Sequence, residues 1–135
     1  MKKFRILIVD DDSKLSLLIQ TMVEAAGIYE TMVENRPYHV LATARTFKPD
    51  LALLDVDMPG KDGGDVAREM KADPLLKDVA VIFLTSLVRK HEAGVRQVPG
   101  GNERFLSKPT DSQTLLGAIE EALAARSTTE VASRE

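Results

Sequence analysis

One stretch decides the fold: Leu51-Ala-Leu-Leu-Asp55-Val-Asp57-Met-Pro-Gly60. It begins with an apolar run that shows no alternation, which is typical of a strand covered on both faces in a parallel sheet. The run stops at Asp55, and the Met-Pro-Gly sequence predicts a turn directly after it. Open α/β sheets place their ligands at the carboxyl ends of their strands. We therefore predict that Asp55 is the reactive group, and the alternative is a structural role in which it only caps the turn.

The composition indicates one globular domain. The chain has 135 residues, of which 44% are hydrophobic and 29% charged, and its net charge is −3. Because it contains no cysteine, disulfides, thiolate metal sites and cysteine nucleophiles are excluded. It has no basic stripe, so we expect no direct nucleic-acid binding. No apolar run reaches membrane-spanning length and the N-terminal run is too short for a signal peptide, so we expect no membrane insertion and a cytoplasmic location.

Strand-like and helix-like segments alternate along the chain. Apolar runs predict strands at residues 4–9, 28–34, 51–54, 79–84 and 105–107. Apolar faces with helical spacing predict helices that include residues 15–26, 40–47, 66–70 and 115–123. Asp12 or Ser13 is expected to cap the first helix, and Asp111 the last.

This alternation predicts a single α/β domain with one doubly wound, five-stranded parallel sheet, helices on both faces and right-handed crossovers. Residues 87–97 are only weakly helical, so the fourth helix is expected to be short or irregular. Residues 127–135 show no apolar periodicity. We therefore expect the domain to occupy residues 1–126 and the remainder to be a flexible tail.

Four of the predicted strands end in polar residues: Asp10-Asp11, Asp55, Thr85 and Lys108. Each is a weak signal by itself, because a strand-end aspartate is common and an isolated lysine is usually a surface cation. The carboxyl ends of parallel strands, however, share one edge of the sheet. The recurrence therefore predicts that these side chains meet in space.

A hard divalent cation is the simplest way to offset the negative charges that are expected to meet at this edge. Two carboxylates about 4 Å apart repel by roughly 4 kcal/mol at an effective dielectric constant near 20. Three carboxylates that face one lysine remain net negative, and Mg²⁺ binds such oxygen sites while it keeps waters and accepts phosphate oxygens. A carboxylate held in this way can attack phosphorus and become an aspartyl phosphate, with Mg²⁺, Lys108 and the Thr85 hydroxyl neutralising the transferred group.

Motifs in four segments resemble those of two-component response-regulator receiver domains. The segments are Ile6-Leu-Ile-Val-Asp10-Asp-Asp12, Leu54-Asp-Val-Asp57-Met-Pro-Gly-Lys-Asp62-Gly63, Val81-Ile-Phe-Leu-Thr85-Ser86 and Phe105-Leu-Ser-Lys108-Pro109. They occur in the order of the family and cover residues 4–125. The resemblance implies a flavodoxin-like sheet with the strand order 2-1-3-4-5.

The resemblance also implies the roles of the acidic residues. Asp55 would be the phosphoacceptor, Asp11 would ligate Mg²⁺ directly, and Asp10 would help to hold the ion through water. In the family the third protein contact to the ion is the backbone carbonyl two positions after the acceptor, here that of Asp57. The Asp57 side chain is a departure, because it adds a fourth acid beside the acceptor. Asp12 is interpreted as a helix cap rather than a ligand.

The remaining motif residues imply a switch. Thr85 would bind the phosphoryl group and move on activation, and Lys108 would pair with that group. Phe105 occupies the aromatic switch position of the family, with ordinary core packing as an equal alternative. Residues 87–104 depart from the family because they lack a long amphipathic fourth helix, which puts the usual output surface in doubt. His91 is interpreted as solvated rather than as a phosphohistidine.

Three other interpretations fit parts of the sequence. The Asp55-Val-Asp57 sequence resembles the nucleophile motif of haloacid-dehalogenase-type phosphatases, but that family places it on the first strand of a longer chain. A flavin-binding flavodoxin is disfavoured because no phosphate loop rich in serine, threonine and glycine follows the first strand. A receiver fold that only binds partners, without phosphorylation, is disfavoured by the complete set of acidic residues, Thr85 and Lys108.

We therefore expect a phosphoacceptor receiver rather than a conventional enzyme, one that promotes its own phosphorylation and autodephosphorylation with Mg²⁺. Its expected partners are a sensor histidine kinase or a histidine phosphotransfer protein, and a downstream protein target. The resemblance also allows a weak homodimer. Because the chain contains no recognisable output domain, we expect the signal to pass by protein contact.

Overall fold

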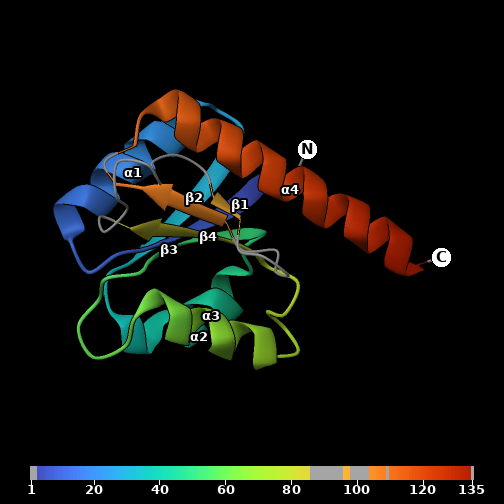
Figure 1. The fold of residues 1–135 in the computed structure, drawn as a ribbon, viewed down its shortest axis with the longest axis horizontal. Coiled ribbons are helices and arrows are strands. Elements are labelled where there is room, and N and C mark those ends of the chain that lie inside the picture. Colours follow the sequence, from blue (N-terminus) through green and yellow to red (C-terminus); the bar gives the residue numbers. More distant parts are fainter. Residues whose placement is uncertain (1–2, 86–95, 98–103, 109, 135) are drawn as a thin grey trace.

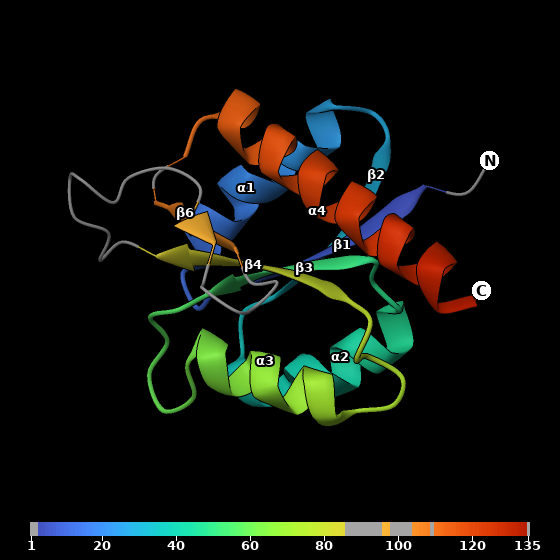
Figure 2. The same ribbon diagram turned by 45° about the vertical axis from the view of Figure 1, so that its right-hand side comes forward.

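The sheet of this protein lies between two helical layers (Figure 1 and Figure 2). The computed structural model describes residues 3–85, 96–97, 104–108 and 110–134. The elements along the chain are β1 (Phe4–Val9), α1 (Ser13–Ala25), β2 (Tyr29–Glu34), the 3₁₀ helix η1 (Pro37–His39), α2 (Val40–Phe47), β3 (Leu51–Asp55), α3 (Gly63–Ala72), β4 (Ala80–Thr85), β5 (Arg96–Gln97), β6 (Arg104–Ser107) and α4 (Ser112–Arg134). Helices α1 and α4 cover one face of the sheet, and α2 and α3 cover the other (Figure 2).

The strand order is β2-β1-β3-β4-β6-β5. The pairs β1–β2, β1–β3, β3–β4 and β4–β6 are all parallel. With β6 as the fifth of the predicted strands, these five strands follow the expected order 2-1-3-4-5. The predicted fold class is therefore confirmed. The two-residue strand β5 pairs antiparallel with β6 and was not predicted, because so short a strand has no periodicity of its own and depends on its neighbour for pairing.

Side chains of the central strands alternate between two apolar cores. Ile6 and Ile8 point to the face covered by α1 and α4, whereas Leu7 and Val9 point to the face covered by α2 and α3. This alternation follows from the pleat of a strand. Every residue of β3 is buried, which explains its continuous apolar sequence. The strand that carries Asp55 is therefore fixed from both sides.

The helix starts agree with the predicted caps. The Asp12 carboxylate accepts hydrogen bonds from the backbone N–H groups of Lys14 and Leu15, at 3.0 and 3.1 Å. Asp111 in the same way accepts from the backbone of Thr114, at 2.7 Å. Asp12 is therefore a cap, as expected, and it fixes the start of α1 immediately after the acidic pair.

Several boundaries differ from the expectations: by one residue, β3 ends at Asp55, β4 spans Ala80–Thr85 and β6 begins at Arg104. β2 begins at Tyr29 rather than residue 28, and η1 precedes α2, as suits a proline-initiated turn. Helix α4 continues to Arg134, although residues 127–135 were expected to form a tail; helical backbone bonding does not require the apolar face on which that expectation depended. The domain boundary at residue 126 stays a prediction. The expectations for the fourth helix and for His91 concern residues outside the described part of the chain.

Within the described residues, the search for a helix both long enough and apolar enough to cross a bilayer finds none.

Candidate functional site

The acidic residues lie on neighbouring strands at the carboxyl edge of the sheet. β1 and β3 pair in a register that sets Val9 against Leu54, so Asp10 and Asp55 are the next residues on adjacent strands. Asp10 is completely buried and Asp55 is 1% exposed. One carboxylate oxygen from each of Asp10, Asp11 and Asp55 lies within 4.8 Å of the others. The structure thus brings together three of the predicted carboxylates.

Lys108 reaches this acidic cluster from the end of β6. Its Nζ lies 2.9 Å from Asp55 Oδ1 and 3.4 Å from Asp10 Oδ2. Its backbone N–H donates to the Thr85 carbonyl at 2.9 Å, which fixes the lysine beside the end of β4. One ammonium faces three carboxylates, so the formal balance of +1 and −3 is −2. By this count the cluster lacks two positive charges.

Burial and charge act together on the ionisation of the pair. Burial raises the pKa of Asp55, and the nearby charge of Asp10 raises it further, against the hydrogen bond from Lys108. The pKa of Lys108 is raised as well, because its bond to Asp55 and the charge of Asp10 outweigh the effect of burial. Lys108 therefore stays protonated, but its single positive charge does not offset the negative charges of both buried carboxylates.

The two oxygens of Asp55 differ in their surroundings. Oδ1 accepts hydrogen bonds from Lys108 Nζ and from the backbone N–H of Asp57, the latter at 3.2 Å. Oδ2 is buried and accepts no hydrogen bond from any residue that the structure describes. Buried polar atoms are normally satisfied, so such an atom needs a partner. An oxygen-only set of carboxylates suits a hard divalent cation such as Mg²⁺, so the residues present fit this ion.

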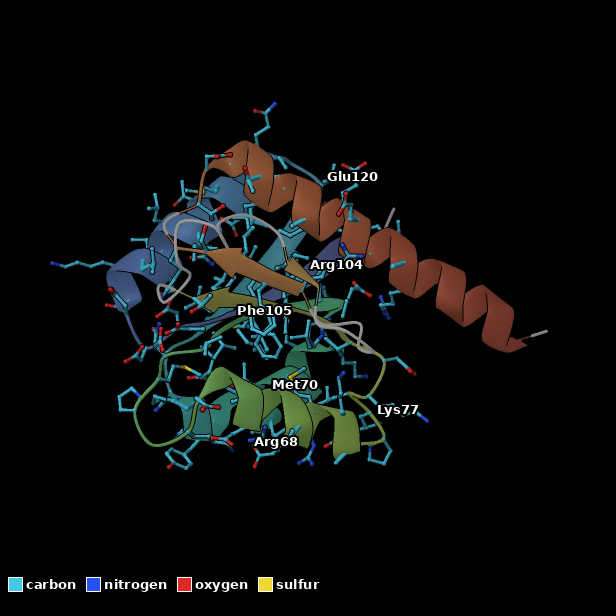
Figure 3. The ribbon with its side chains drawn as sticks, in the orientation of Figure 1. Arg68, Met70, Lys77, Arg104, Phe105 and Glu120 are labelled. Carbon is cyan, nitrogen blue, oxygen red and sulfur yellow. The ribbon has the colours of Figure 1, made fainter. Side chains whose placement is uncertain are left out.

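Thr85 and Phe105 occupy the strands next to Asp55. Thr85 is the last residue of β4 and is 7% exposed, one position beyond Leu84, which pairs with Asp55. The ring of Phe105 on β6 stacks on Phe83 with a centroid separation of 5.0 Å. Figure 3 shows Phe105 on the side of the sheet where Met70 of α3 lies. Phe105 is thus packed against the core, and its role as a switch stays a prediction.

Asp57 lies in the loop after β3, with an exposed side chain. It does not belong to the three-carboxylate cluster found among the described residues. Its observed contact with the site is made through its backbone N–H, which donates to Asp55. The proposed use of its carbonyl as a metal ligand stays a prediction.

Sequence reasoning assigned no role in shaping the site to two residues, Gly63 of the second motif and Asn35. A Cβ atom on Gly63 would lie 2.5 Å from the Asp55 carbonyl oxygen, so α3 can begin there only without a side chain. The side chain of Asn35 donates to the Asp10 carbonyl at 2.6 Å. Asn35 follows the end of the second strand, and that position was an available signal, because the other strand ends had been read as functional.

Comparisons of the sequence and of the structure with known proteins lead to the same family. The family model described as the response regulator receiver domain matches residues 6–120. The chain is 33% identical over 119 residues to the polar-differentiation response regulator DivK of Brucella anthropi, covering 87% of this chain and 94% of that protein.

Two solved structures share the fold. A CheY-like receiver domain protein from Methanospirillum hungatei has a TM-score of 0.78 and 23% identity, over 95% of this chain and 99% of that one. The receiver domain of a sensor histidine kinase from Pseudomonas aeruginosa has a TM-score of 0.75 and 22% identity, over 91% and 99%, and was crystallised with a magnesium ion in its active-site cleft. The chain belongs to the response regulator receiver domain family of two-component signalling.

Proposed function

We propose that this receiver accepts a phosphoryl group on Asp55 in a reaction that requires Mg²⁺. The observation that carries the proposal is the cluster of Asp10, Asp11 and Asp55 around Lys108, with Asp55 Oδ2 left without a hydrogen bond among the described residues. A site with this deficit of positive charge suits both a divalent cation and the anionic group that the cation would hold.

Asp11, Asp10 and Asp55 are the side chains proposed to hold the ion, together with the backbone carbonyl of Asp57. When bound, Mg²⁺ supplies positive charge to the oxygens of the transferred group. The magnesium ion in the receiver domain of the Pseudomonas aeruginosa sensor kinase supports this assignment by analogy.

The chemistry proposed for Asp55 is a simple displacement. An Asp55 oxygen attacks the phosphorus of a phosphohistidine on the donor protein and forms an acyl phosphate as the phosphorus–nitrogen bond breaks. The donor imidazole leaves with the bonding electron pair and takes up a proton. Lys108 already donates to Oδ1 at 2.9 Å, so it orients the attacking carboxylate and then pairs with the added phosphoryl oxygens.

The signal is proposed to pass from Asp55 to the surface beside β4 and β6. Thr85 ends the strand next to Asp55, and its carbonyl is bound to the Lys108 backbone. A hydrogen bond from the Thr85 hydroxyl to the phosphoryl group would favour one arrangement of this edge, and Phe105 would follow on the neighbouring strand. A ligand shifts such an equilibrium only by binding the two arrangements differently, and the new contacts of the phosphoryl group supply that difference.

Receiver domains interact with histidine kinases and with downstream targets. For this chain, a sensor kinase or a histidine phosphotransfer protein is the proposed donor, and a protein that docks on the switched surface is the proposed target. The cytoplasm is the proposed compartment.

Intact-protein mass spectrometry after incubation with acetyl phosphate and Mg²⁺ tests the proposal. We expect one phosphoryl group on the wild-type chain, and no label on Asp55→Asn or when the metal is removed with a chelator. Asp78→Asn is the control, because Asp78 is exposed and its described contact is through its backbone carbonyl. Label retained by Asp55→Asn would exclude Asp55 as the acceptor. Steady release of phosphate that depends on Asp57 would favour the hydrolase interpretation instead.

A further inference from the structure

The end of β2 holds the Asp10 peptide at two points. The backbone N–H of Asp10 donates to the Glu34 carbonyl at 3.3 Å. The carbonyl of Asp10 accepts from Asn35 Nδ2 at 2.6 Å. The paired register of β1 and β2 ends at Val9 and Glu34. A side-chain amide thus continues the pairing one step beyond the last backbone pair of these two strands.

The same amide also contacts α1. Asn35 Nδ2 donates to Ser16 Oγ at 3.0 Å, and Ser16 is 1% exposed. The Ser16 hydroxyl donates in turn to the Ser13 carbonyl at 3.1 Å. One side chain therefore joins the end of β1, the first turn of α1 and the end of β2.

Asn35 is itself held in place by its neighbours in sequence. The Glu34 carboxylate is buried and accepts hydrogen bonds from the Arg36 backbone N–H at 3.0 Å and from Thr43 Oγ1 at 2.6 Å. Because Thr43 lies on α2, the Glu34 side chain is tied to that helix, and Arg36 is tied to Glu34. The amide therefore approaches Asp10 from a fixed backbone.

The Asp10 carbonyl belongs to the peptide plane that leads into Asp11. Because that unit is planar, a bond to its oxygen restricts the rotation that sets where the Asp11 side chain leaves the backbone. The Asp12 N–H donates to Asp10 Oδ1 at 2.9 Å and fixes the buried acid of the pair. The Asn35 bond is thus the described contact best placed to hold the turn against repulsion between the carboxylates.

We propose that Asn35 is a positioning residue for the acidic pair, acting through the Asp10 peptide. The inference rests on the proposed function, in which that pair holds Mg²⁺. Residues behind a metal site orient the ligands, and their loss commonly weakens metal binding about 10- to 100-fold. The placement of the Asp10 and Asp11 carboxylates depends, in this proposal, on a residue that does not itself bind the ion.

The test is a Mg²⁺ titration followed by NMR chemical shifts, without a phosphodonor. Asn35→Ala is expected to weaken Mg²⁺ affinity about 10-fold. Asn35→Asp is expected to weaken it more, because a carboxylate oxygen would face the Asp10 carbonyl with no proton to donate. Gln20→Ala is the matched control: the Gln20 amide also joins α1 to β2, by donating to Thr31 Oγ1 at 3.0 Å, but does not contact Asp10. Its affinity is expected to equal that of the wild type.

Thermal unfolding without Mg²⁺ accompanies each titration and shows which variants fold. Weaker binding by folded Asn35 variants, with unchanged binding by Gln20→Ala, supports the proposal. It is overturned if the Asn35 variants bind like the wild type, if Gln20→Ala loses as much affinity, or if both Asn35 variants fail to fold, because the role would then be structural. A wild-type chain that binds no Mg²⁺ would instead refute the proposed function and, with it, the basis of this inference.

Discussion

The two edges of the sheet carry buried or half-buried aspartates in opposite situations. At the amino edge, Asp50 precedes β3, and both of its oxygens are bonded: Oδ2 accepts from the Arg5 backbone at 2.8 Å, and Oδ1 from Arg126 at 3.0 Å. At the carboxyl edge, Asp55 ends the same strand with one oxygen bonded and the other without a hydrogen bond among the described residues. Of the two aspartates, Asp50 has both oxygens bonded, whereas Asp55 keeps an acceptor that no described residue bonds.

The two ends of β3 thus contrast an aspartate that holds the fold together with the aspartate proposed as the phosphoacceptor. The bonds of Asp50 join β1, β3 and α4, so its charge is used to hold elements together. The carboxylates of Asp10, Asp11 and Asp55 repel one another, and the fold tolerates this because the two cores fix the strands. Strained or uncompensated groups persist where the surrounding structure holds them, and they cluster at functional sites.

The largest expected effect comes from removing space at the carboxyl edge. In Gly63→Ala the new Cβ would meet the Asp55 carbonyl oxygen at 2.5 Å, and backbone atoms there cannot move aside as a flexible side chain would. We expect a loss of about 3 kcal/mol in the free energy of unfolding, measured by urea denaturation. The displaced Asp55 should also be labelled poorly by acetyl phosphate.

Gly117→Ala is the matched control for this change. Gly117 lies in α4, and a Cβ there would meet nothing within 4 Å. Alanine should therefore stabilise the helix by roughly 0.5–1 kcal/mol, because it restricts the unfolded chain. Equal effects at the two glycines would show that close packing at the carboxyl edge is not what makes Gly63 necessary.

The comparison also explains what the sequence could predict. The five parallel strands and their order follow from apolar runs, and Asp10, Asp55 and Lys108 converge because parallel strands end at one edge. Those features depend on position along a strand, which the sequence displays directly.

The features that were missed depend on contacts between distant segments. Asn35 acts on a residue 25 positions away through one side-chain bond, and the need for Gly63 arises from where α3 meets β3. The strand β5 exists through its pairing with β6. No local period or composition encodes such contacts, because each requires the relative placement of two elements.

A second prediction compares the two aspartates of β3 directly. Asp50→Asn turns an acceptor into an amide donor that faces Arg5 or Arg126, so we expect the free energy of unfolding to fall by about 2 kcal/mol. In Asp55→Asn the amide oxygen can still accept from Lys108, while the amide nitrogen replaces the unbonded Oδ2. Relief of repulsion from Asp10, less the lost attraction of Lys108, should raise stability by roughly 1 kcal/mol.

Urea denaturation of the two variants without Mg²⁺ measures this difference. The essential result is that the two changes in unfolding free energy have opposite signs. The substitutions are chemically the same and lie at the two ends of one strand. If Asp55→Asn were destabilised as much as Asp50→Asn, the acidic cluster would be a stabilising network and the contrast between the edges would be lost.

The last prediction concerns Glu34, a carboxylate at the carboxyl edge that resembles Asp50 in having its oxygens bonded. Burial acts against its charge, but hydrogen bonds from Thr43 and from Arg36 outweigh this and lower its pKa from the ordinary value of 4.5. A carboxyl group with a lowered pKa in the folded state stabilises the fold above about pH 4.5. That contribution is lost as the pH falls through the folded-state pKa, because the unfolded chain binds the proton more readily.

Thr43→Val removes the hydroxyl that donates to Glu34 and should cost about 1 kcal/mol at pH 7. The gap in unfolding free energy between this variant and the wild type should narrow below pH 4.5, since a protonated Glu34 gains less from the hydroxyl. Thr46→Val is the control, because Thr46 lies in the same helix but donates to the Ala42 carbonyl, so its effect should not vary with pH. A Thr43→Val gap that stays constant from pH 7 down to the lowest pH at which both chains still fold would mean that the Thr43 bond does not act on the charge of Glu34. In that case the hydrogen bond from Thr43 would fix the position of the Glu34 carboxylate without stabilising its charge. Glu34 would then differ from Asp55 only in how its oxygens are placed.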